Sequence, residues 1–182
     1  MSASDTRVAL LRGINVGTAK RIAMADLRKL VGALGYGDVR TLLNSGNVVF
    51  TASRGSPGDT AARIEKAIAA RLGVTTRVTV LKGNEVAAAV RDNPLASIAD
   101  DESRLLVMAS PDPKDLARLK PLLEKRWAPE VLALGPRVAY LWCAGGILKS
   151  RLWAAANRSL EDTGTARNLA TMKKLLALIE GG

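Results

Sequence analysis

Residues 38–52, DVRTLLNSGNVVFTA, predict a β-hairpin from which the rest of the first half can be worked out. Two strands, 38–43 and 47–52, flank the turn Asn44-Ser45-Gly46-Asn47, and Asn and Gly are residues that tight hairpin turns favour. Antiparallel strands joined by so short a turn are neighbours in one sheet. The hairpin therefore supplies two adjacent strands of a predicted sheet.

The segments on either side of the hairpin alternate between strand and helix patterns. Residues 7–14 and 77–82 have the short apolar or alternating character of strands. Residues 24–34 and 60–72 repeat apolar side chains at three- and four-residue spacing, which predicts two helices, the second with Asp59 as its N-cap. The resulting order, β-α-β-β-α-β, is that of a ferredoxin-like split unit.

A similar order of elements begins again after an acidic stretch. A short helix that starts at Gly83 ends before Pro94, and residues 92–103 form a predicted linker between a first half, 1–91, and a second half, 104–182. We therefore predict an α+β fold of two ferredoxin-like (split β-α-β) halves, an apparent duplication, whose second copy ends in an extra C-terminal helix. The elements predicted for the second half are a strand 104–109, a helix 114–125 bent near Pro121, a hairpin of 130–134 and 137–143, and helices 149–160 and 165–179.

Length and composition limit the class of protein. A chain of 182 residues can bury a sizeable core, and no apolar run approaches the roughly 18 residues of a membrane helix. Residues 1–7 lack the basic and apolar regions of a secretory signal. A single cysteine, Cys143, excludes an internal disulfide and suits a reducing compartment. We expect a cytoplasmic protein with no membrane partner.

The charge is unevenly distributed along the chain. The formal net charge is +10, and residues 1–91 hold 14 Lys and Arg against 6 Asp and Glu, whereas residues 92–182 hold 13 against 11. A basic half indicates an anionic partner such as nucleic acid, a nucleotide or a phosphate ester. An Arg- and Ala-rich composition, with arginines on solvated helix faces, explains the same charge without any partner.

Two loops rich in glycine and asparagine, 11–17 (LRGINVG) and the turn at 44–47, are the first candidates for a site, because loops on a rigid scaffold carry most functional residues. Gly13 and Gly17 bracket Asn15 ahead of the first predicted helix, whose backbone N–H groups and positive end can hold an anion. The spacing is not that of a Walker phosphate-binding loop. A tight connection whose glycines only allow positive φ, and an ordinary hairpin turn, explain the same residues structurally.

Two further segments of the second half combine small residues with cations at predicted helix starts. Gly145-Gly146 precede Lys149 and Ser150, and Arg167-Asn168 lie in the first turn of the last predicted helix. Such groups at a helix N-terminus would hold a phosphate or carboxylate. The structural alternatives are that Ser150 is an N-cap and that Arg167, with Thr171 and Lys174, lies on a solvated helix face.

These motifs together carry a family resemblance. LRGINVG at 11–17, SGNVVF at 45–50, Gly146-Ile147 with Lys149-Ser150-Arg151, and TARN at 165–168 follow one another in an order that resembles the bacterial domain of unknown function 1697 family. The resemblance runs from about Arg7 to Leu178. It implies a duplicated ferredoxin-like α+β architecture and no established activity.

The residue types present exclude most familiar catalytic chemistry. There is no histidine, so His-based triads and imidazole bases are excluded, and one Cys without His argues against zinc. We predict no metal and no cofactor. Whether the protein is an enzyme stays open, since catalysis would fall to Lys20, Lys149, Ser45 and Ser150.

The preferred interpretation is a site for a small anionic ligand, bearing a phosphate or a carboxylate, at which the four segments converge on one cleft. A nucleic-acid-binding ferredoxin-like module is an alternative, weakened because residues 1–91 contain only Tyr36 and Phe50 as aromatics. A second alternative is a non-catalytic protein that oligomerises through an unpaired sheet edge. The sequence leaves the oligomeric state open. The predicted ligand-binding residues are Arg12, Asn15, Gly17, Ser45, Asn47, Lys149, Ser150, Arg167 and Asn168.

Overall fold

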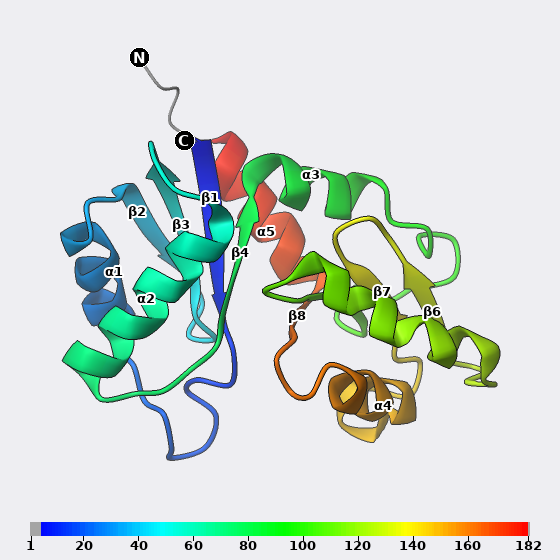
Figure 1. The fold of residues 1–182 in the computed structure, drawn as a ribbon. Coiled ribbons are helices and arrows are strands. Elements are labelled where there is room, and N and C mark those ends of the chain that lie inside the picture. The colour runs from blue at the N-terminus through cyan, green and yellow to red at the C-terminus, as the bar shows by residue number, and fades with distance from the viewer. Residues whose placement is uncertain (1–4, 182) are drawn as a thin grey trace. The chain divides into compact units, whose positions relative to one another are not determined.

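The computed structural model describes residues 5–181, which form two α+β units (Figure 1). The first unit contains the described residues up to Asn84 together with those from Leu178 onward, and the second runs Glu85–Ala177. Each unit is built on a four-stranded sheet in which every neighbouring pair of strands is antiparallel. The predicted duplicated α+β fold is confirmed.

The first unit has the predicted hairpin at one edge of its sheet. Its elements are β1 (Asp5–Leu11), α1 (Met24–Ala33), β2 (Gly37–Leu42), β3 (Asn47–Ala52), α2 (Pro57–Leu72) and β4 (Val78–Lys82). β1 lies between β3 and β4, with Val8 opposite Val49 on one side and Leu81 on the other. β2 pairs with β3 alone, so the strand order is β2-β3-β1-β4.

One face of this sheet and the two helices form the core of the first unit. Strand side chains alternate between faces, so Leu11, Phe50 and Val80 lie on the same side. The apolar faces of α1 and α2, which include Leu27 and Ile64, pack against them. Figure 1 shows both helices on this face of the sheet.

Helix α2 begins at Pro57, earlier than the predicted 60, and its cap is Ser56 rather than Asp59. The Asp59 backbone N–H donates to Ser56 Oγ at 3.1 Å, and the Ser56 backbone N–H donates to the Asp59 carboxylate at 3.2 Å. This reciprocal pair is a capping box, and Pro57 fits the first turn because its missing N–H would have no partner there. The Ser56 side chain, and then its backbone, lower the pKa of Asp59 by hydrogen bonding.

We expect Ser56→Ala to lower the free energy of unfolding of the first unit by about 1 kcal/mol, because the first turn of α2 loses its acceptor. The variant should also return the pKa of Asp59 toward its ordinary value of 3.8. A lowered native pKa stabilises the fold above the unfolded-state pKa, and this stabilisation is lost as the pH falls through the native pKa. The difference between wild type and variant should therefore be smaller at pH 3 than at pH 7 in urea denaturation. An equal difference at both pH values would contradict this role of Asp59.

The second unit repeats the arrangement of the first. Its strand order, β6-β7-β5-β8, corresponds to β2-β3-β1-β4. The elements that follow β4 are α3 (Gly83–Arg91), β5 (Leu105–Ala109), η1 (Pro113–Glu124), β6 (Val131–Leu134), β7 (Ala139–Trp142), η2 (Ile147–Lys149), α4 (Arg151–Ser159), β8 (Thr165–Asn168) and α5 (Leu169–Glu180).

The predicted helix 165–179 is wrong in its first turn. Residues Thr165–Asn168 form β8, which pairs antiparallel with β5 so that Arg167 lies opposite Val107. Four residues are too few to show a strand pattern beside a long helical one, and the partner strand lies far earlier in the chain. The second unit therefore has four strands, as the first does, and its fourth strand lies between the two helices that were predicted to follow each other directly.

The predicted helix at 114–125 is a 3₁₀ helix, η1, with Pro121 inside it. Leu116, Leu119 and Leu122 are its buried residues, and a spacing of three places them on one face of a helix with three residues per turn. Proline also disfavours the α-helical hydrogen bond at its own position. The leucine spacing and Pro121 together account for the tighter helix.

Candidate functional site

The loop after β1 and the turn between β2 and β3 lie side by side at one end of the first sheet. β1 ends where its antiparallel neighbour β3 begins. The backbone N–H of Leu11 donates to Gly46 O at 2.9 Å, and Asn15 Nδ2 donates to Asn44 O at 2.7 Å. The first two of the four predicted segments are therefore in contact.

Asn15 holds the first loop in shape. Its φ of 55° is in the left-handed region, which Asn tolerates better than most residues. Its Nδ2 also donates to Ile22 O at 2.9 Å, and its Oδ1 accepts from the Ile22 N–H at 2.8 Å. The Asn15 amide thereby ties the turn to the residues that lead into α1.

Asn47 braces the hairpin turn from inside. Its side chain is fully buried, and Nδ2 donates to Leu42 O at 2.7 Å and to Ser45 Oγ at 3.0 Å. Gly46 adopts a φ of 87°, which favours glycine. Asn47 therefore has the role of an ordinary hairpin-turn residue, and Asn44 and Ser45 are the exposed polar residues of the turn.

A hollow of about 310 Å³ opens where the two loops meet the start of α1, and it is lined by Asn15, Arg21, Ile22, Ala23 and Asn44. Ala23 is the N-cap of α1 and has no side-chain oxygen for the N–H groups of the first turn. Those groups have no partner within the helix and lie at its positive end. An anion here would meet both them and the Arg21 guanidinium, although Asp26 adds an opposing charge in the first turn.

Arg12 lies next to β4. Its backbone N–H donates to Arg77 O at 2.9 Å, and its carbonyl accepts from Thr76 Oγ1 at 2.7 Å. Gly17 is exposed on the loop with a φ of 63°. Neither residue lines the hollow, so of the predicted residues only Asn15 does.

In the second unit, Ser150 is the N-cap of α4. Its Oγ accepts from the Trp153 backbone N–H at 2.9 Å and donates to the Glu130 carboxylate, whose Oε1 accepts from the Leu152 N–H at 3.3 Å. The carboxylate of Glu130 thus occupies the helix N-terminus at which an external anion was predicted. Lys149, beside it, is exposed.

Arg167 is buried in β8, with 9% of its surface exposed. Its Nη1 donates to Thr165 Oγ1 at 3.2 Å and to Ala166 O at 2.9 Å. Burial lowers the pKa of its guanidinium to about 10, so it stays protonated at neutral pH. The alternative of a solvated helix face with Arg167 on it is wrong, because Arg167 belongs to a buried strand. Asn168 Oδ1 accepts from the Thr171 N–H at 2.9 Å and so caps α5.

The second sheet brings these two segments to the same end. β7 ends at Trp142, opposite Leu105, and β8 ends at Asn168, opposite Leu106. The first two predicted segments are therefore in contact in the first unit, and the other two lie at the same end of the sheet in the second unit. Their convergence on a single cleft stays a prediction.

Cys143 is a core residue rather than an exposed nucleophile. It is fully buried, and its Sγ lies 3.7 Å from Leu141 O. Burial raises the pKa of its thiol, a hydrogen bond with Ser150 lowers it, and the charge of Glu130 raises it. Reactive cysteines have lowered pKa values and access to solvent, and Cys143 has neither.

The structure adds residues to the first hollow that the sequence analysis did not select. Asn44 lines the hollow, and its backbone carbonyl, which any residue carries, accepts from Asn15, while Ala23 matters because it lacks a side-chain acceptor. The carbonyl of Asn44 gives no sequence signal, whereas the missing acceptor at Ala23 follows from its residue type and from the helix start predicted at residue 24. Between residues 5 and 181, no three His, Cys, Asp or Glu side chains gather as a metal site would require, and no helix there is long and apolar enough to cross a membrane.

Comparison with known proteins gives a family and a related fold. The family model described as a protein of unknown function, DUF1697, matches residues 5–140. The structure of the conserved bacterial protein SP0830 from Streptococcus pneumoniae is similar, with a TM-score of 0.76 and 23% identity over 97% of this chain and 99% of that one. At this identity the likeness shows a shared fold alone. No curated protein matches the sequence.

Proposed function

Because the chain belongs to the DUF1697 family of proteins of unknown function, its activity has to be inferred from its own residues. We propose that it binds a small anion, bearing a phosphate or a carboxylate, in the hollow at the start of α1. The observation that carries this proposal is the combination, in one hollow, of Arg21 and a helix N-terminus whose cap, Ala23, offers no side-chain acceptor.

Size and charge support a small ligand. Ligand pockets typically measure about 300–1,000 Å³, and this hollow, at about 310 Å³, is at the lower end. It can hold a phosphate or a short carboxylate but not a whole dinucleotide. The excess of cations in residues 1–91 would also draw anions toward this unit.

The first unit supports the alternative of a nucleic-acid-binding module less well than it supports a site for a small anion. Ferredoxin-like RNA-binding modules stack bases on exposed aromatic side chains of the sheet. Phe50 is fully buried and Tyr36 is 8% exposed, and their rings pack 4.8 Å apart in the core beneath α1 and α2. Neither ring offers a face for base stacking.

The proposal can be tested by titrating the protein with inorganic phosphate and with acetate in a calorimeter. We expect Arg21→Gln to weaken binding by about tenfold, the loss of one charge-assisted hydrogen bond. Asp26→Asn should strengthen binding by about two- to fivefold, because it removes a competing charge from the first turn. Arg28→Gln removes the same charge as Arg21→Gln from an exposed residue outside the hollow and serves as the matched control.

Equal weakening by Arg21→Gln and Arg28→Gln would show a general charge effect and contradict the site. Absence of binding by both anions would contradict the proposal outright. A parallel titration with single-stranded RNA at two salt concentrations addresses the alternative, because phosphate-backbone binding weakens steeply with salt. Salt-dependent RNA binding that Arg21→Gln leaves intact, without binding of the small anions, would favour a nucleic-acid-binding module.

A further inference from the structure

Two exposed aliphatic side chains lie in adjacent loops at the end of the first sheet where β1 stops. Val16, in the loop that follows β1, is 72% exposed, and Leu43, in the turn between β2 and β3, is 49% exposed. Their neighbours Asn15 and Asn44 are joined by the 2.7 Å hydrogen bond, which holds the two loops together. Figure 1 shows the loop after β1 extending beyond this end of the sheet. Apolar side chains are therefore exposed on both loops at the same end of the first unit.

The backbone holds Leu43 in an unfavourable conformation. Its φ of 59° lies in the left-handed region, which bulky side chains rarely adopt. A strained residue persists only where the surrounding structure fixes it, and such residues gather at functional sites. The side chain of leucine cannot hydrogen-bond to a ligand, so a role for it in binding requires an apolar partner.

The loop that follows β1 is basic. Residues 12–23, RGINVGTAKRIA, contain Arg12, Lys20 and Arg21 but no Asp or Glu, and the turn at 43–46 carries no charged side chain. Lys20 and Arg21 are exposed, and neither forms an ion pair with any residue that the structure describes. The next acid along the chain is Asp26, in the first turn of α1. Cations therefore surround the two exposed aliphatic side chains in the sequence of this loop and should attract an anionic partner.

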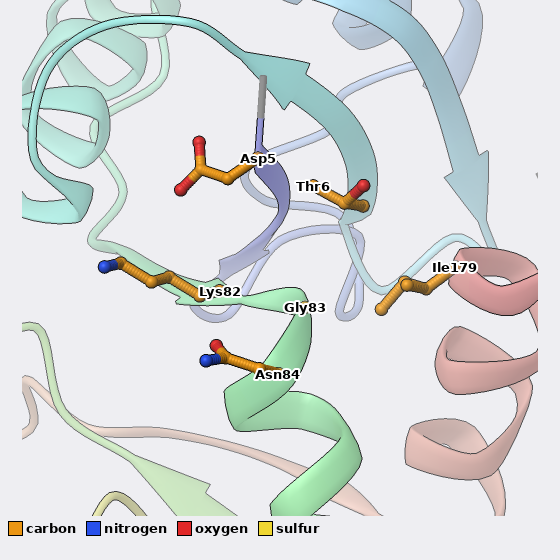
Figure 2. Close-up of a pocket in the computed structure, with 6 residues that line it drawn as sticks. All are labelled: Asp5, Thr6, Lys82, Gly83, Asn84 and Ile179. Carbon is orange, nitrogen blue, oxygen red and sulfur yellow. The ribbon is translucent and has the colours of Figure 1, made fainter. Parts of the chain in front are cut away.

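The opposite end of the first sheet, where β1 begins, has a different character. Two hollows of about 440 Å³ each open there, and Figure 2 shows one of them. An acid and a cation line each hollow, Asp5 with Lys82 in the first and Asp38 with Arg40 in the second. The most exposed apolar side chains of the described residues lie in neither hollow. The two ends of the sheet therefore differ both in charge and in exposed apolar surface.

The combination of exposed aliphatic side chains and cations favours a membrane surface over other anionic partners. A small ligand is usually buried in its pocket over about 70–90% of its surface, whereas Val16 and Leu43 lie on exposed loops that do not enclose a ligand. The phosphate backbone of a nucleic acid would use the cations but not the aliphatic side chains. A bilayer with anionic headgroups offers a partner to both, because binding increases with the apolar area buried and with the attraction of cations.

We propose that this end of the first unit binds the surface of an anionic lipid bilayer, with Val16 and Leu43 in the membrane interface and Lys20 and Arg21 at the level of the headgroups. This surface is a second function beside the proposed anion site, although Arg21 belongs to both. The expectation of no membrane partner rests on the lack of an apolar run long enough to span a bilayer, and binding at the surface requires no such run.

The experiment is co-sedimentation of the full chain with lipid vesicles. Vesicles of phosphatidylcholine and phosphatidylglycerol at a ratio of about 2:1 should bind the protein, and vesicles of phosphatidylcholine alone should bind it much more weakly. Val16→Ser and Leu43→Asn should each weaken binding to the anionic vesicles about fivefold, and about 25-fold together, because each removes a partly buried aliphatic group from the interface. Lys20→Gln should weaken binding about fivefold through the loss of one attraction to the headgroups.

Two matched controls test whether the effects belong to this surface. Ile98→Asn removes an aliphatic side chain that is 50% exposed, but from the acidic stretch 92–103. Lys82→Gln removes an exposed cation at the opposite end of the first sheet (Figure 2). Both variants should bind the anionic vesicles as the wild type does. Hydrogen exchange of the β1 and β3 amides checks that each variant in the first unit is folded.

The proposal is overturned if the anionic vesicles do not bind the protein, or if Leu43→Asn and Ile98→Asn weaken binding equally. Binding that Lys20→Gln weakens but that Val16→Ser and Leu43→Asn leave intact also overturns it, and would favour a soluble polyanion such as RNA. Titration with free phosphate should be unchanged by Val16→Ser and Leu43→Asn, because neither residue lines the hollow at α1. This keeps the failure of one proposal separate from the failure of the other.

Discussion

Replacing Gly46 by alanine should lower the free energy of unfolding of the first unit by about 3 kcal/mol, the sum of a backbone and a packing cost. The φ of 87° at Gly46 strains a residue that has a side chain. A Cβ there would lie 2.8 Å from Leu11 Cβ and 2.7 Å from Ile14 Cδ1. The backbone of the first loop would have to move, because the Leu11 Cβ cannot rotate away.

Gly17→Ala is the matched control. Gly17 also has a positive φ, 63°, but no atom lies within 4 Å of a Cβ built there, so only the backbone cost of about 1 kcal/mol applies. All three tryptophans, Trp127, Trp142 and Trp153, belong to the second unit, so their fluorescence reports that unit alone. Hydrogen exchange of the β1 and β3 amides measures the first unit. Equal destabilisation by the two substitutions would show that the close packing at Gly46 is unimportant.

Asn15→Ala should destabilise the first unit by about 2–3 kcal/mol, because three side-chain hydrogen bonds, each with a net contribution of about 1 kcal/mol, are lost together. The same variant should weaken anion binding at α1, since Asn15 holds Ile22 next to the helix start. Hydrogen exchange and phosphate titration measure the two effects on the same protein.

Asn44→Ala tests whether the side chain or the backbone carbonyl of Asn44 holds the two loops together. Asn44 contributes its carbonyl to the Asn15 contact, and alanine keeps that carbonyl. We expect its effect on stability to stay within about 0.5 kcal/mol, as for most exposed substitutions. If Asn44→Ala destabilised the unit as much as Asn15→Ala, the loops would be held together by something other than the Asn15 amide.

Most elements of the fold could be predicted from local pattern. The spacing of apolar residues within a short window was enough to predict three elements that the structure contains. These are the hairpin at 38–52, the helix at 24–34 and the strand at 77–82. β8 could not be predicted, because four residues followed by a helical pattern carry too little signal and β8 depends on β5 for its hydrogen bonds. The 3₁₀ form of η1 was visible only in part, in the three-residue spacing of its leucines and in Pro121.

Several of the predicted ligand-binding residues have a structural role in the fold, and ligand binding by any of them stays a prediction. Asn15, Asn47, Ser150 and Asn168 each use their side chains to brace a turn or cap a helix, and such local hydrogen bonding is common for Asn and Ser. A polar residue in a loop has the same appearance in sequence whether it binds a ligand or the backbone. The distinction depends on which groups already have partners.

By itself, the sequence determined the alternation of strands and helices, the duplication and the placement of loops rich in glycine and asparagine, since these follow from spacing and backbone preference within short windows. Only the tertiary structure decided that Asn15 and Asn44 line one hollow with the start of α1, and that Arg40 lines another with Thr6 of β1 and Ile179 of the last helix. The reason is physical. Whether a charge is satisfied depends on neighbours from distant parts of the chain, and the local pattern around Arg40 contains no information about Leu178.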